Sequence, residues 1–101
     1  MTHEINVLKM QCEKVMAVGQ ELDRIRLLIK EGDNKKTVSI IAEINANLHL
    51  LELERYFESA IKADLLNVSA LIMQDKYIQA DRDIREIKAN LLENWEHLAC
   101  K

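Results

Sequence analysis

The chain has 101 residues, of which 49% are hydrophobic, and its 14 basic and 17 acidic residues give a net charge of −3. This length supports one domain with a thin core, and the basic residues are interspersed with acidic ones, which argues against the clustered cationic surface that nucleic acids require. Because the chain has no proline and only two glycines, its composition predicts a nearly all-α fold over residues 1–101.

The first predicted helix covers residues 2–31. Its apolar positions recur every three or four residues and so form one stripe on one helix face. Thr2 is a suitable N-cap, and Gly32-Asp33-Asn34 supplies residues that tolerate a left-handed backbone and start a turn. The end of this helix is therefore the best-marked boundary in the chain.

The second predicted helix begins at residues 34–37, and its apolar stripe shifts after Leu51 onto Leu53 and Phe57. No strong helix breaker follows before residue 74, yet an unbroken helix of that length would measure about 57 Å at ~1.5 Å per residue. We place a break between residues 58 and 64. The third helix is then expected at about 61–74 and the fourth at about 77–90. Residues 91–101 either continue the helix or bend near Asn94, which gives four to five helices.

A faint internal repeat relates two parts of the chain. Residues 28–48 align with residues 71–91 without a gap, and eight aligned pairs are identical. The offset of 43 is close to twelve helical turns, so two unrelated amphipathic helices would also match their apolar positions. A match of apolar positions does not account for the identical polar pairs Glu43/Glu86 and Asn47/Asn90. The repeat therefore favours a helix-turn-helix unit used twice, with the matched phase as the alternative.

The polar residues predict no catalytic or metal chemistry. The three histidines are widely separated, and His97 with Cys100 could supply only two metal ligands. Acidic residues such as Asp81 have basic neighbours one turn away, as Arg85 is, and these form ordinary surface ion pairs. With no glycine-rich loop and no nucleophile motif, we expect neither an enzyme nor a cofactor.

Several large apolar residues fall beside the narrow stripes. They are Met10, Met16, Leu27, Ile40, Leu50 and Met73. A wide apolar face is either buried on a second side or exposed to a partner, and methionine suits a groove that accepts another helix. Both interpretations remain open from these residues: the core of a four- or five-helix bundle, or a helix-binding groove.

No apolar run approaches the roughly 20 residues that span a bilayer, and the N-terminus lacks the basic start and hydrophobic run of a signal peptide. We therefore expect a cytoplasmic protein with no membrane-spanning segment. Cys12 and Cys100 are far apart and belong to no motif, so reduced thiols are the expectation in that compartment.

Residues 65–80 resemble the helix pair of tetratricopeptide proteins. An apolar helix with the small residues Ser69 and Ala70 is followed by a short polar turn, and then Tyr77 and Ala80 open the next helix. The sequence departs from that pattern at Asp75, where glycine is usual. It also lacks the tryptophan and glycine of the first helix and the terminal proline.

More narrowly, the chain resembles the tetratricopeptide-like chaperones of the needle subunit in bacterial type III secretion systems. Residues 32–44 are similar to the earlier helix pair of that family, and residues 93–100 are similar to its tryptophan-bearing C-terminal helix. The resemblance implies helical hairpin repeats that curl into a concave apolar groove. It also implies two partners: the needle subunit, whose amphipathic C-terminal helix lies in the groove and is kept from polymerising, and a small helical co-chaperone.

We expect seven residues to contribute to such a groove. Five are apolar residues on the first helix of each pair and two are aromatic packing anchors beside them: Met16, Leu22, Leu65, Val68 and Ile72, with Tyr77 and Trp95. The alternative is a structural homodimer, in which two copies build a four-helix bundle and no foreign helix is bound.

Overall fold

The computed structural model describes residues 2–98, with side chains over residues 10–94 except Gln11. The elements in chain order are α1 (Thr2–Glu31), α2 (Asn34–Asn47), the short 3₁₀ helix η1 (Leu48–Leu51), α3 (Arg55–Met73) and α4 (Tyr77–Leu98). Within this range every element is helical, so the predicted all-α fold is confirmed. The predicted bounds of the first helix are also confirmed, and the C-terminal segment continues α4 as far as Leu98 without a bend.

The turn between α1 and α2 is the one that the sequence marks. Gly32 has φ +77°, its N–H donates to Ile29 O at 3.1 Å, and the N–H of Asp33 donates to Leu28 O at 3.2 Å. This pair of bonds is the Schellman arrangement, which uses a left-handed residue to satisfy the last carbonyls of a helix. Asp33 then caps α2, because its Oδ1 accepts from the N–H of Lys36 at 3.1 Å.

The turn between α3 and α4 has the same geometry. Asp75 has φ +60°, its N–H donates to Ile72 O at 3.0 Å, and the N–H of Lys76 donates to Leu71 O at 2.9 Å. Leu71 and Ile72 therefore accept the same two bonds as their partners in the internal alignment. The shared turn gives two antiparallel helical hairpins, but it does not by itself establish a duplicated unit.

The break between α2 and α3 lies earlier than predicted. We expected it at residues 58–64, but α3 already begins at Arg55, and the chain turns through η1 and Glu52, which has φ +54°. Glu54 caps α3 by accepting from the N–H of Phe57 at 3.0 Å. The burial of Leu51 holds this turn against the core. A glutamate in the left-handed region is uncommon, which is why composition did not mark the position.

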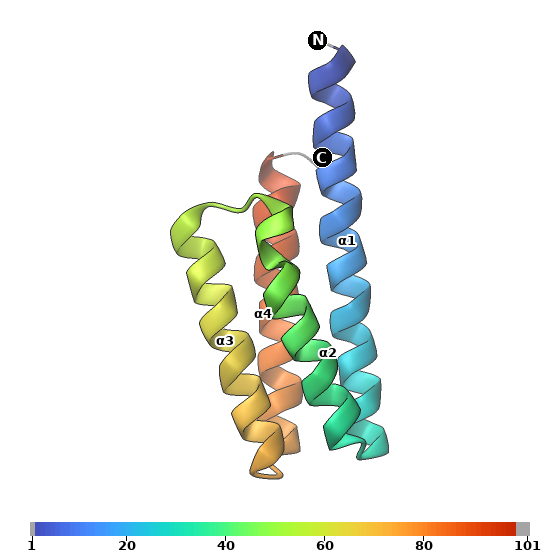
Figure 1. The fold of residues 1–101 in the computed structure, drawn as a ribbon, viewed down its shortest axis with the longest axis vertical. Coiled ribbons are helices and arrows are strands. Elements are labelled where there is room, and N and C mark those ends of the chain that lie inside the picture. The colour runs from blue at the N-terminus through green and yellow to red at the C-terminus, as the bar shows by residue number, and fades with distance from the viewer. Residues whose placement is uncertain (1, 99–101) are drawn as a thin grey trace.

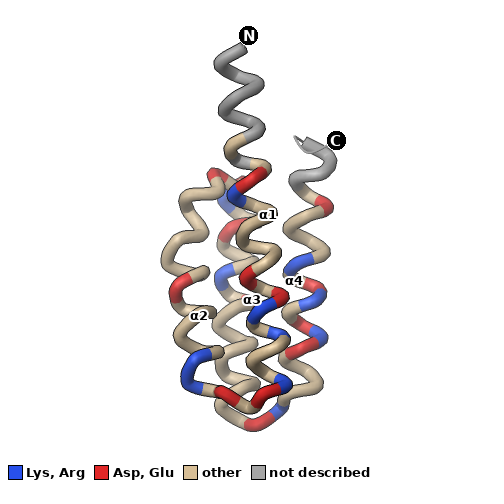
Figure 2. The backbone as a smooth tube through the Cα atoms, turned by 90° about the vertical axis from the view of Figure 1, so that its right-hand side faces the viewer, with Lys and Arg blue, Asp and Glu red and all other residues tan. Residues whose placement is uncertain are grey.

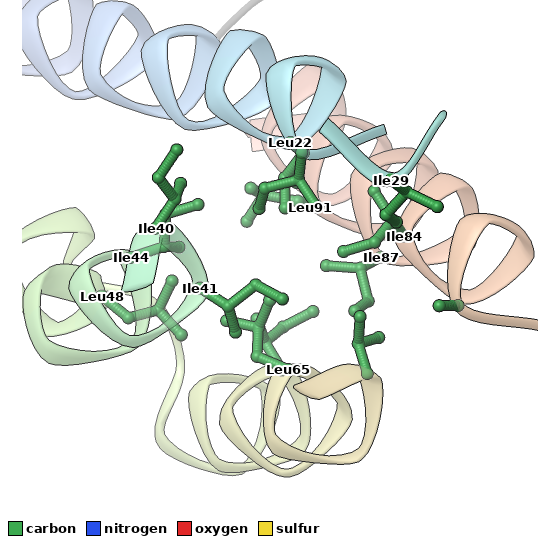
Figure 3. Close-up of a cluster of buried hydrophobic side chains, with 14 of the residues drawn as sticks. Leu22, Ile29, Ile40, Ile41, Ile44, Leu48, Leu65, Ile84, Ile87 and Leu91 are labelled. Carbon is green, nitrogen blue, oxygen red and sulfur yellow. The ribbon is translucent and has the colours of Figure 1, made fainter. Parts of the chain in front are cut away.

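The four helices close into a ring around one core (Figure 1). Each helix packs mainly against two neighbours, and the contact between α1 and α4 joins the first hairpin to the last. Side chains from all four helices point toward one another in the centre, as Figure 3 shows for Leu22, Ile41, Leu65 and Ile84. The architecture is thus a closed four-helix bundle. The open superhelical stacking that the tetratricopeptide resemblance implies is not seen among the described residues.

Candidate partner-binding surface

Four of the seven predicted groove residues lie in the core of the bundle. Leu22, Leu65, Val68 and Ile72 are each at most 1% exposed. In this arrangement they do not line an open groove, because α4 packs against α1 and closes the side on which the groove would open; their contact with a partner stays a prediction. A partner could reach these residues only if the ring opened.

Of the other three predicted residues, Met16 lies outside the core and Tyr77 packs against its edge. Met16 is 56% exposed on α1, whereas Tyr77 is half-buried at the start of α4. Met16 is also far from Tyr77. Tyr77 lines the same depression as Ile29, and Met16 lies about 20 Å before Ile29 along α1, at ~1.5 Å per residue. Trp95 belongs to α4, and its side chain lies outside the described residues.

The most exposed large apolar side chain among the described residues is one that the sequence analysis missed. Ile78, in the first turn of α4, is 88% exposed. It lies in a depression of about 330 Å³ between the end of α1 and the start of α4. We call this surface the α1–α4 patch; its residues are Ile29, Lys30, Tyr77, Ile78, Asp81, Arg82 and Arg85. The only sequence signal was that Ile78 falls off the buried stripe of its helix.

The α1–α4 patch is cationic although the chain is acidic. It contains three basic side chains, Lys30, Arg82 and Arg85, against the single carboxylate of Asp81. That carboxylate is already engaged, because it lies 2.8 Å from the Nε of Arg26 and 3.5 Å from the Nε of Arg85. Acidic and basic positions otherwise alternate along α4 (Figure 2). The patch therefore combines an exposed apolar side chain with a local excess of positive charge.

Tyr77 fixes one wall of the α1–α4 patch. Its hydroxyl oxygen lies 2.7 Å from Asp75 Oδ1 and 3.0 Å from Asn34 Oδ1, so the ring is tied to both hairpin turns. The hydrogen bond to the Asp75 carboxylate raises the pKa of Tyr77 above its ordinary value of 10.0, because only the protonated hydroxyl can donate that bond. This wall is built by turn residues and does not depend on a partner.

Two smaller depressions differ from the patch in charge. The first, of about 170 Å³ between α1 and α2, is rimmed by Glu21 and Glu43 and floored by Ile40 and Ile44. The second, of about 120 Å³ between α3 and α4, is polar; its residues are Asp64, Asn67, Asp83, Glu86, Ile87 and Asn90. The charged residues that line both depressions are acidic. The isoleucines in their lining, Ile40, Ile44 and Ile87, are buried in the core.

Cys12 forms a disulfide, so the expectation of a reduced thiol at this position is wrong. The sequence contains one other cysteine, Cys100, which lies outside the described residues. The two positions are too far apart in sequence for spacing to have indicated a pair. Disulfides persist mainly in oxidising compartments, which makes this bond relevant to where the protein works.

Among the described side chains, no three His, Cys, Asp or Glu residues lie close enough to hold a metal ion. The pair His97 and Cys100, considered from the sequence, falls outside them. No helix in the described part of the chain is both long and apolar enough to cross a membrane. The comparisons with known proteins gave no family, no curated protein and no solved structure that matches this chain.

Proposed function

We propose that this chain is a non-enzymatic chaperone that binds an amphipathic helix of another protein on the outside of its bundle. The observation that carries the proposal is Ile78, a large apolar side chain left almost fully exposed beside a core that is complete without it. Single exposed apolar residues are common on protein surfaces. Ile78 differs because it lies in a depression with Ile29 and the ring of Tyr77.

The specific role that we propose is a chaperone for the needle subunit of a bacterial type III secretion system, acting with a small helical co-chaperone. The resemblance of residues 65–80 supports this role, and so does the pair of helical hairpins joined by equivalent turns. A polymerising subunit exposes a sticky apolar helix, and covering that helix removes the surface that nucleates a filament. The closed core alters one part of the expectation: the partner helix binds outside the ring rather than between its helices.

A cytoplasmic location belongs to this proposal, and the Cys12 disulfide is the observation that weighs against it. Alkylation of free thiols in intact cells distinguishes a cytoplasmic location from an oxidising compartment. Modified cysteines would agree with the cytoplasmic role, whereas a persistent disulfide would place the protein in an oxidising compartment and contradict that part of the proposal.

The test of chaperone activity is a polymerisation assay. A purified needle subunit is diluted from denaturant, and filament formation is followed by light scattering with increasing amounts of this chain. We expect suppression that is complete near a stoichiometric ratio, because each subunit has one helix to cover. Filament growth that is unchanged by an excess of folded chain would refute the proposed activity.

A structural homodimer is the second candidate, and one observation favours it. Helix α1 has 30 residues, against 14 to 22 in the other α-helices, and its N-terminal turns rise beyond the rest of the bundle (Figure 1). The apolar sequence positions Ile5 and Leu8 belong to these turns. A second copy could pair with them. Light scattering on the purified chain would give twice the monomer mass in that case.

A further inference from the structure

We infer that the α1–α4 patch is the docking site for an acidic amphipathic helix, with Ile78 as its apolar anchor and Lys30, Arg82 and Arg85 as partners for its carboxylates. This inference rests on the proposed function, because it names the place and the charge of the partner. Of the residues that the sequence analysis named for binding, only Tyr77 belongs to this surface; Met16, Leu22, Leu65, Val68 and Ile72 lie elsewhere, and the side chain of Trp95 is outside the described residues.

Charge distinguishes this site from the α1–α2 and α3–α4 depressions. An acidic helix would be repelled by Glu21 and Glu43 at the α1–α2 depression and by the carboxylates of Asp64 and Asp83 at the α3–α4 depression. Like charges brought together across an interface oppose binding, whereas complementary charges speed association and fix register. The α1–α4 patch is the one of these three depressions whose charged residues are mainly basic.

The basic groups of the patch are available to a ligand. Within the described residues Lys30 has no ion-pair partner, and Arg82 is only 3.9 Å from Asp83, at the limit of a salt bridge. Arg85 shares Asp81 with Arg26, and the shorter of the two contacts belongs to Arg26. A carboxylate from a partner therefore competes with weak contacts. Planar guanidinium groups also suit carboxylates, because they can donate two parallel bonds.

Exposure selects the apolar anchor. Ile78 is 88% exposed, whereas Ile87, which lines the acidic α3–α4 depression, is buried in the core. A helix that carries one apolar row flanked by glutamates would cover Ile78 with its apolar row and direct its carboxylates toward the basic residues on both sides. This is the usual pattern of helix recognition, with anchors at helical spacing and a charged rim.

The test uses two fluorescent helical peptides of about four turns each, both with a leucine row, one flanked by glutamates and the other by lysines. Fluorescence anisotropy with the full chain is expected to show binding of the acidic peptide only, weakening as salt is raised. Arg82→Glu and Ile78→Ser should each weaken binding by about tenfold or more. Arg24→Glu is the matched control, because it makes the same charge reversal on an exposed α1 residue outside the patch.

Each other outcome overturns the inference. Equal binding of the acidic and basic peptides would remove the charge argument, and an equal loss with Arg24→Glu and Arg82→Glu would show that only net charge matters. Binding of neither peptide would also overturn it. Suppression of needle-subunit polymerisation by the Arg82→Glu variant at wild-type strength would leave the proposed function standing and place its surface elsewhere, so the two proposals can fail separately.

Discussion

Replacement of Leu65 by alanine should strongly destabilise the protein, whereas the same change at the adjacent Leu66 should not. Leu65 is fully buried and points into the centre of the ring (Figure 3). Leu66, its neighbour on α3, is 64% exposed. A buried leucine that is truncated to alanine loses its transfer free energy and leaves a cavity, at a cost of about 2–5 kcal/mol. The exposed leucine should cost no more than about 0.5 kcal/mol.

These losses are large against a total stability of about 5–15 kcal/mol, and they are easy to measure. For a domain of this size the melting temperature changes by about 4–8 °C per kcal/mol, so we expect Leu65→Ala to melt roughly 8–40 °C below the wild type. Circular dichroism at 222 nm during heating gives both values. If Leu65→Ala and Leu66→Ala melted within a few degrees of the wild type, Leu65 would not be a core residue, and the open groove would describe the protein better than the closed ring.

The two glycines should respond to alanine in opposite directions in urea unfolding: Gly32→Ala loses about 1 kcal/mol because its φ is +77°, and Gly19→Ala gains about 0.5–1 kcal/mol because it lies inside α1 with room for a Cβ. Equal signs would contradict the turn geometry. Titration with Ellman's reagent in denaturant should find no free thiol until a reductant is added, and two thiols per chain beforehand would disprove the Cys12 disulfide. Tyr77→Phe should lower the melting temperature at pH 7. Because the folded-state pKa of Tyr77 is raised, its contribution is present below pH 10 and is lost as the pH rises through that raised pKa, so wild type and Tyr77→Phe should converge at high pH; an unchanged difference would refute the hydrogen-bond assignment.

The hairpin turns could be predicted because their residues have local preferences. Gly32 followed by Asp33 marks both a left-handed C-cap and an N-cap, and the structure uses both residues in these ways. Asp75 takes the conformation for which glycine is the usual choice, which the comparison with the tetratricopeptide pattern had singled out as a departure. The break at Glu52 had no such signal. Its only trace was the shift of the apolar stripe from Leu51 to Leu53.

The candidate surface was harder to predict, because exposure depends on which helices meet. We predicted Leu22, Leu65 and Ile72 as residues of an open groove, because the sequence could not show that α4 closes the ring over them. Apolar periodicity excludes Ile78 from the core, and so it could have indicated an exposed anchor. The cationic surroundings of Ile78 come from the first and the last helix, since Lys30 lies in the last turn of α1 and Arg82 lies in α4. Only the tertiary contact brings them together.

The most direct test of the account is size-exclusion chromatography with light scattering on the full chain, alone and co-expressed with the small helical proteins encoded beside it. We predict a monomer when the chain is alone and a stoichiometric heterocomplex with one acidic, needle-like helical partner. A stable homodimer that forms no complex with any neighbouring gene product would contradict the chaperone function.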